Sequence, residues 1–293
     1  IFSNNSKVIQ SFKQNEDDLK KKEKSNLCEP SNESNNHAPN ILFYSNTTME
    51  EEINEENDEY IKNCLEIVLD LEKLKRETGP KVYFNFTENE LKKEKIALFD
   101  IDETLIHCTG NIDTKGNIPH HKEIMINLPC GQKVKVGINI RPFWEKALDM
   151  LIDKYNIVAF TASHQAYADS VLNSIDPDGK YFKHRLYRNN CTSTTVDGSK
   201  LYIKDLDIFV PHYNLKDIVI IDNSVLSFTY HLNNGIPIEP YYDKKDDQNL
   251  LIIAKYLSEI YDCDDLREKN RIKFKLEKQK EEIFKELEKK YSS

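Results

Sequence analysis

The chain has 293 residues, of which 39% are hydrophobic and 31% are charged, so it can fill one sizeable domain and still leave polar flanks. Its formal net charge of −9 argues against a broad attraction to nucleic acid or to an anionic membrane surface. Its six cysteines form no CxxC pair, which argues against a zinc site and a disulfide framework and favours reduced thiols.

The first 59 residues are rich in Asn, Ser, Lys and Glu, so we predict a disordered polar tail over 1–59. The lysine run 20–22 fits either a nuclear-import signal or a solvated stretch. The chain starts at Ile1 without a methionine, which leaves an upstream anchor as an open alternative, and no apolar run in it is long enough to span a bilayer.

Residues 60–90 are predicted to form a flanking helix and a linker. Apolar side chains recur at helical spacing from residue 60 to residue 76, and Gly79 followed by Pro80 ends the pattern. We expect this helix to lean on the domain that follows rather than to found its core.

The segment 91–262 is predicted to form one α/β domain. Three continuous apolar runs read as strands of a parallel sheet that is covered on both faces. These runs cover 96–100, 157–160 and 218–221. Helical patterns alternate with them, which is typical of a three-layer, Rossmann-like fold. Pro142 fits the first turn of one helix, Ser163 fits the N-cap of the next, and a later helix covers about 249–261.

An insert between residues 106 and 141 reads as two β segments on either side of a turn at 129–131. The insert is too short for a large cap domain. We therefore expect a β-hairpin insert that leaves the carboxyl edge of the parallel sheet open.

The C-terminal segment 263–293 is predicted to form a charged helix with Glu and Lys at i,i+4 spacing. A narrow apolar stripe runs along it, and this stripe either docks a partner or frays. The stripe consists of Leu276, Ile283, Leu287 and Tyr291.

Polar side chains stand where the three predicted strands end. Asp100, Thr161 and Asp222 should meet at the carboxyl edge of the sheet, where open α/β sheets bind ligands. Asp102 adds a second carboxylate one residue after Asp100. Crowded carboxylates repel one another unless a cation is present, and Mg²⁺ prefers carboxylate and phosphate oxygens. The cluster therefore predicts a metal and a phosphate together.

Five sequence blocks carry a resemblance to a known family: FDIDETLIH, RPFWEKAL, FTASHQAYAD, LYIKDL and IIDNS. In this order they resemble the haloacid dehalogenase (HAD) superfamily. The resemblance is closer to the small-CTD-phosphatase or NLI-interacting-factor-like group with its FCP1 homology domain, phosphatases that act on the C-terminal domain of RNA polymerase II. It covers about 95–261 and implies a HAD-like fold.

The resemblance assigns roles to matching residues. Asp100 would be the nucleophile that forms an aspartyl-phosphate, and Asp102 would be the general acid and base. Thr161 would donate to a phosphoryl oxygen, and Lys204 would neutralise charge on the phosphate and on Asp100. Thr104 would shape the loop rather than react. The implied Mg²⁺ ligands are Asp100, Asp102, Asp222 and Asn223, with Asp222 either orienting the shell or reaching the ion through water.

The substrate is less well determined. Arg188 and Tyr167 match residues that face the substrate in this family, and for Tyr167 a place in the helix core is an equal alternative. His164 and Gly110 depart from the apolar pocket that receives a proline in these relatives, which leaves polymerase-tail specificity open. The segment 192–199 is longer than expected, either as a surface loop or as a selectivity loop.

The predicted function is therefore a Mg²⁺-dependent protein serine/threonine phosphatase that acts on a phosphorylated protein or peptide in the nucleus or cytoplasm, without direct nucleic-acid binding. One alternative is a non-catalytic binding module, like relatives that serve as receptors in mitochondrial import. Another is a membrane-associated phosphatase of lipid-metabolism proteins. The acid pair favours catalysis, because a binding module has no physical need for two repelling carboxylates.

Overall fold

The computed structural model describes residues 55–73, 83–84, 86–87, 93–115, 118–196 and 199–291. The predicted polar tail lies outside the described residues up to residue 54, and so do the lysine run 20–22 and most of the predicted linker. Within the described residues, no helix has both the length and the hydropathy of a membrane span.

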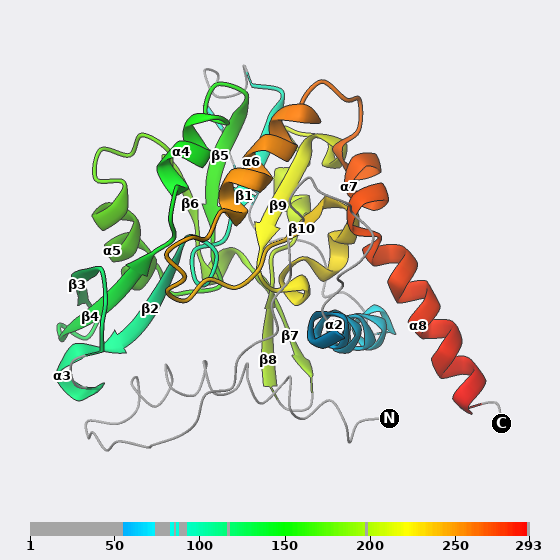
Figure 1. The fold of residues 1–293 in the computed structure, drawn as a ribbon, viewed down its shortest axis with the longest axis horizontal. Coiled ribbons are helices and arrows are strands. Elements are labelled where there is room, and N and C mark those ends of the chain that lie inside the picture. The colour runs from blue at the N-terminus through cyan, green and yellow to red at the C-terminus, as the bar shows by residue number, and fades with distance from the viewer. Residues whose placement is uncertain are drawn as a thin grey trace.

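A five-stranded parallel sheet forms the centre of the fold (Figure 1). Its strand order is β10-β9-β1-β5-β6, and all neighbouring strands pair in parallel. The strands are β1 (Lys95–Phe99), β5 (Tyr155–Phe160), β6 (His184–Leu186), β9 (Ile218–Asp222) and β10 (Gly235–Pro237). The three predicted strands are the adjacent β9, β1 and β5. The sheet with helices on both faces confirms the expected three-layer α/β class.

Alternate residues of the three central strands β9, β1 and β5 enter two separate cores. Ala97 and Phe99 pack into one buried cluster, whereas Ile96 and Leu98 pack into the other. Helices α4 (Trp144–Asp149), α5 (Gln165–Ile175) and α6 (Asn249–Glu259) cover the first face. Helix α2 (Glu55–Lys73), the 3₁₀ segment η5 (Val225–Asn234) and α8 (Leu276–Tyr291) cover the second. Because both faces are covered, the strands are apolar throughout rather than alternating.

Two helices begin later than the sequence predicts. Helix α4 begins at Trp144 behind Phe143, which has a left-handed backbone with φ 59°, so Pro142 lies outside the first turn. Helix α5 begins at Gln165, and its N-cap residue His164 makes no capping hydrogen bond. The prediction that Ser163 caps this helix is wrong, because the Ser163 hydroxyl donates to the side chain of Asp102 instead.

The insert is larger than the predicted hairpin. Strands β3 (Lys122–Asn127) and β4 (Lys133–Ile140) form the expected hairpin, and Gly131 in its turn has φ 85°, which favours glycine. Strand β2 (Ile106–Asn111) pairs with the other side of β4. The three strands form a small antiparallel sheet beside the parallel one, at the left of Figure 1.

The described residues of the segment 192–199 belong to two paired strands rather than to a loop. Strand β7 (Thr192–Val196) pairs antiparallel with β8 (Ser199–Ile203), and the register joins Thr192 to Ile203. Strand β8 runs directly into Lys204. The hairpin therefore links the polar segment after β6 to one of the predicted catalytic residues.

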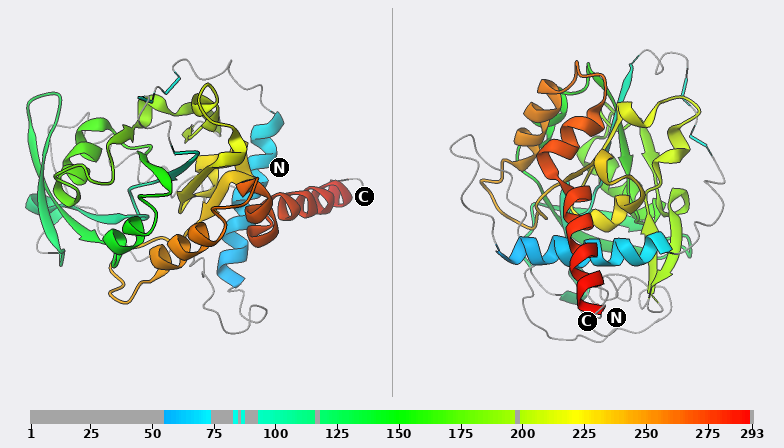
Figure 2. Two further views of the ribbon diagram at one scale, coloured as in Figure 1. Left: turned by 90° about the horizontal axis from the view of Figure 1, so that it is seen from above. Right: turned by 90° about the vertical axis from the view of Figure 1, so that its right-hand side faces the viewer.

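The charged C-terminal segment forms two helices instead of one. Helix α7 (Leu266–Phe274) ends at Lys275, whose φ of 55° breaks the helix before α8. Leu276 and Ile283 of the predicted stripe are buried in the cluster that contains α2. Helices α2 and α8 cross (Figure 2), and Lys62 of α2 pairs with Glu286 of α8 at 2.9 Å. Leu276, Ile283 and the partly buried Leu287 thus pack within the chain.

Candidate active site

Three strand ends bring polar side chains to one edge of the sheet. Asp100 follows β1, Thr161 follows β5, and Asp222 ends β9. Strand β1 pairs with both neighbours, and the backbone N–H of Asp100 donates to the carbonyl of Ile221 at 3.0 Å. All three side chains are buried. The structure therefore brings together the residues that the sequence predicted for this edge.

Lys204 joins two of the carboxylates. Its Nζ lies 2.5 Å from Asp100 Oδ1 and 2.6 Å from Asp222 Oδ2, and only 1% of the side chain is exposed. Its backbone N–H donates to the carbonyl of Ser227 at 2.7 Å, which fixes the residue at the end of β8. Burial lowers the pKa of Lys204, but the two carboxylates outweigh it and hold the pKa above its ordinary value. The side chain is therefore a cation between two acids.

Asp102 is supported by two hydroxyl groups from the start of α5. Ser163 Oγ donates to Asp102 Oδ2 at 2.7 Å, and Tyr167 donates its hydroxyl to Oδ1. Burial and the nearby carboxylate of Glu103 raise the pKa of Asp102 to about 6, although both hydroxyl hydrogen bonds act in the opposite direction. A carboxyl with this pKa can carry a proton near neutral pH.

The sequence predicts that Tyr167 either faces the substrate or packs in the core on its helix. The structure places its hydroxyl on Asp102, and its ring packs against the core of the first face. Its contact with substrate stays a prediction, whereas its contact with the acid is part of the fold.

The oxygen atoms at this edge fit a hard cation. Thr104 donates to Asn223 Oδ1 at 3.2 Å, which fixes the amide, and Asp222 accepts from the N–H of Ser224 as well as from Lys204. Carboxylate and amide oxygens are ligands that Mg²⁺ accepts. Because both oxygens of Asp222 are engaged, the geometry suits Asp222 to orienting the shell better than to direct ligation.

The tightest acidic group of the described residues lies elsewhere. Asp205, Asp207 and His231 place one potential ligand atom each within 4.8 Å of one another, and they are the one such trio in the described part of the chain. Asp100, Asp102 and Asp222 are less tightly grouped. Their chemistry, not their clustering, is what matches a magnesium site.

Arg188 is fixed by three neighbours. Its Nε donates to the carbonyl of Ala162 at 2.6 Å, and its Nη1 lies 3.0 Å from His164 Nε2. Its guanidinium lies 4.6 Å from the ring centroid of Tyr202 on β8. The β7–β8 hairpin thus supports a cation next to the residues that follow Thr161. Sequence reasoning missed Tyr202, because nothing in the pattern shows that this ring faces residue 188.

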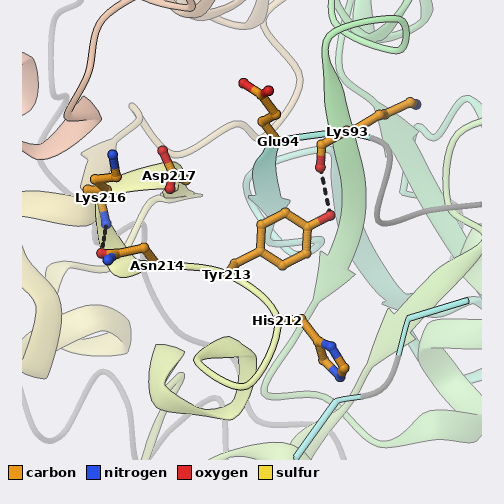
Figure 3. Close-up of a pocket in the computed structure, with 7 residues that line it drawn as sticks. All are labelled: Lys93, Glu94, His212, Tyr213, Asn214, Lys216 and Asp217. Carbon is orange, nitrogen blue, oxygen red and sulfur yellow. Dashed lines mark hydrogen bonds between the residues drawn. The ribbon is translucent and has the colours of Figure 1, made fainter. Parts of the chain in front are cut away.

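A separate cavity of about 350 Å³ lies at the opposite edge of the sheet (Figure 3). Lys93 and Glu94 precede β1 and Asp217 precedes β9, so this cavity faces the amino ends of the strands. The Tyr213 hydroxyl closes part of it by donating to the carbonyl of Lys93 at 2.8 Å. The cavity is therefore not the candidate active site.

One protein-family model and several known proteins match the part of the chain that carries these residues. The family model described as NLI interacting factor-like phosphatase matches residues 95–267. CTD small phosphatase-like protein 2 of Dictyostelium discoideum is 38% identical over 188 residues, which cover 64% of this chain and 31% of that protein. Nuclear envelope morphology protein 1 of Schizosaccharomyces pombe is 33% identical over 182 residues, which cover 61% and 36%. This chain therefore spans well under half the length of both relatives.

A solved structure of the fission yeast RNA polymerase II CTD phosphatase Fcp1 is also similar. It is 19% identical, with 66% of this chain and 58% of that chain covered and a TM-score of 0.42.

Proposed function

Because the chain belongs to the NLI interacting factor-like phosphatase family, we propose that it hydrolyses phosphoserine or phosphothreonine in proteins through an aspartyl-phosphate. The observation that carries the proposal is the arrangement of two acids at one strand end. Asp100 is paired with the buried cation of Lys204, and Asp102 is a neighbouring carboxyl with a pKa raised to about 6. One acid is suited to attack and the other to proton transfer.

In the first step, an oxygen of Asp100 attacks phosphorus while the bond from phosphorus to the serine or threonine oxygen breaks. Asp102 gives its proton to that leaving oxygen. Lys204 occupies Asp100 Oδ1, so we assign the attack to Oδ2. Thr161 Oγ1 accepts from the N–H of Ser163 at 3.0 Å, and we assign the hydroxyl proton of Thr161 to a phosphoryl oxygen.

In the second step, Asp102 takes a proton from water as the water oxygen attacks phosphorus. The bond between phosphorus and Asp100 breaks, and phosphate leaves. The positive charge of Lys204 offsets negative charge at Asp100 in both steps.

The proposed cofactor is Mg²⁺, held by Asp100, the backbone carbonyl of Asp102 and Asn223, with Asp222 orienting the shell. When bound, the ion would polarise the phosphoryl group and offset the repulsion between the acids. The oxygen donors described above support this assignment.

The proposed substrate class is a phosphorylated side chain on a protein. The described residues between β1 and Arg141 form the small antiparallel sheet and the four-residue helix α3 (Ile112–Lys115) but no larger cap, which supports an edge open to an extended segment. Arg188 is the residue we assign to guide that segment. Relatives named as a CTD phosphatase-like protein and as a nuclear envelope protein suggest the polymerase tail as one candidate substrate and the nucleus or nuclear envelope as one candidate location.

The decisive experiment is hydrolysis of p-nitrophenyl phosphate by the purified chain, with Mg²⁺ and then with excess EDTA. We expect turnover that the chelator abolishes and added Mg²⁺ restores. Phosphoserine peptides with and without a following proline then define the substrate. Absence of turnover on the aryl phosphate and on every peptide would contradict the proposal and favour a binding module.

A further inference from the structure

A buried arginine lies behind the loop that carries the candidate general acid. Arg141 follows β4, is fully buried with 0% exposure, and forms a two-pronged pair with Asp247. Its Nε and Nη2 each lie 2.8 Å from one oxygen of that carboxylate. Nη2 also donates to the carbonyl of Glu239 at 2.9 Å. A bidentate pair of this kind fixes the orientation of the Arg141 guanidinium and also neutralises its charge.

The remaining donors of Arg141 point at the loop 101–106. Nη1 donates to the carbonyl of Thr104 at 3.1 Å and lies 3.5 Å from that of Glu103. The backbone N–H of Arg141 donates to the carbonyl of Leu105 at 2.9 Å. Arg141 thus contacts three consecutive carbonyl groups, which come directly after Asp102.

The loop needs such support because its backbone is unusual. Glu103 has φ 57°, a conformation that side chains other than glycine rarely adopt and that costs free energy unless surrounding contacts impose it. The N–H groups of Leu105 and Ile106 both donate to the carbonyl of Ile101, which makes a tight turn. The carbonyls on the other side of the turn are those that Arg141 contacts.

We infer that Arg141 is a positioning residue for this loop and that Asp247 holds Arg141 in place. Arg141 touches no reacting group. It acts through the backbone on Asp102 on one side and on Thr104, which holds Asn223, on the other. Proton transfer needs Asp102 within hydrogen-bond reach of the leaving oxygen, so a small shift of the loop would weaken general-acid catalysis first. This kinetic consequence rests on the proposed function, whereas the clamp itself does not.

The test compares Arg141→Lys with Arg267→Lys in the full chain. Arg267 makes the same two-pronged contact, with Asp265, at 3.0 and 2.7 Å, and lies beside residues 210–215 at the opposite edge of the sheet. Two substrates are used. Phenyl phosphate has a poor leaving group that needs a proton, and 2,4-dinitrophenyl phosphate has a good one that does not.

We expect Arg141→Lys to lower kcat on phenyl phosphate by about 10²-fold and on the dinitrophenyl ester by less than about tenfold. Arg267→Lys should change both rates equally and little. A merely structural role would reduce the active fraction and so lower both rates by one factor. Equal losses on the two esters in Arg141→Lys would overturn the inference.

Amide hydrogen exchange gives a readout without turnover. Amides of the loop 101–106 should exchange faster in Arg141→Lys than in the parent chain and in Arg267→Lys, and unchanged protection would refute the clamp. If Arg141→Lys does not fold, Asp247→Asn answers the same question by both measurements. An unmodified chain that hydrolyses neither these esters nor any of the phosphopeptides would refute the proposed function, and hydrogen exchange would still decide the clamp.

Discussion

The ammonium of Lys204 lies 2.5 Å from the carboxylate of Asp100, and water is almost fully excluded from both groups. This pair defines the candidate active site. It also makes each partner costly to remove, because a buried charge without its counter-charge is strongly unfavourable.

Asp100→Asn should reduce turnover of p-nitrophenyl phosphate by more than about 10³-fold, because the amide cannot attack phosphorus. The fold should persist, since the amide oxygen still accepts from Lys204. The measurement is kcat together with the thermal unfolding midpoint. Asp217→Asn, at the opposite edge of the sheet, is the matched control and should keep full activity. Undiminished turnover in Asp100→Asn would exclude it as the nucleophile.

Lys204→Met should lower the free energy of unfolding by roughly 3–5 kcal/mol, because Asp100 and Asp222 then face each other without a cation. Urea unfolding measures the loss. The double variant Lys204→Met with Asp222→Asn should be less destabilised than the sum of the single variants predicts. Strict additivity would show that the two side chains do not interact.

Ser163→Ala should move the alkaline limb of the kcat/KM profile to higher pH by about half to one unit. The reason is that the Ser163 hydroxyl stabilises ionised Asp102 and so lowers the pKa of that acid, which burial holds at about 6. Without the hydroxyl, the pKa rises and the protonated acid persists to higher pH. Ser170→Ala removes a hydroxyl of the same helix that donates to the carbonyl of Ala166, and its profile should match the parent. A shift toward lower pH would contradict the assignment.

Tyr202→Leu should lower kcat/KM for a phosphopeptide by about two- to fivefold, because Arg188 loses the ring on which it lies. Hydrolysis of p-nitrophenyl phosphate, which has no peptide chain for Arg188 to guide, should not change. Tyr202→Phe retains the ring and should behave like the parent chain. Equal losses on the small and the large substrate would remove the hairpin from any role in selectivity.

Ile283→Ala should destabilise the chain by about 2–4 kcal/mol, since this side chain is 7% exposed in the contact between α8 and α2. Ile272→Ala on α7 is the control, because Ile272 is 63% exposed, and its effect should lie within about 0.5 kcal/mol. Urea unfolding of both variants is the test. Similar values for the two would show that α8 does not pack as described.

The sheet and its acidic edge could be predicted because their signals are local. A run such as Ile96 to Phe99 identifies a buried strand, and parallel pairing then fixes where Asp100 must lie. Strands β6 and β10 have three residues each and carry no comparable pattern. Lys275 gives no sign in the sequence of its left-handed backbone.

The contacts that support the candidate catalytic residues could not be predicted, because they join residues that are far apart in the sequence and meet only in the folded chain. Ser163 is a residue type that commonly caps helices, but its hydroxyl donates to the carboxylate of Asp102, 61 positions away in the chain. The clamp of Arg141 joins residues more than 100 positions apart. The hydrogen-bond partners of both residues are set by the tertiary fold and leave no pattern in the local sequence.

The crossing of α2 and α8 brings together an element that precedes the family-matched region and one that follows it. Both helices bury side chains in the cluster that also contains Leu98 and Ile220 of the central sheet. We therefore expect the cooperative unit of unfolding to be larger than the region that the family shares. A chain cut at residues 95 and 267 would keep η5 but would expose the apolar side chains of this cluster that α2 and α8 cover, and an apolar surface of that kind favours aggregation. The domain that carries the catalytic edge would then need α2 and α8 to stay soluble, although neither helix contributes a residue to the proposed reaction.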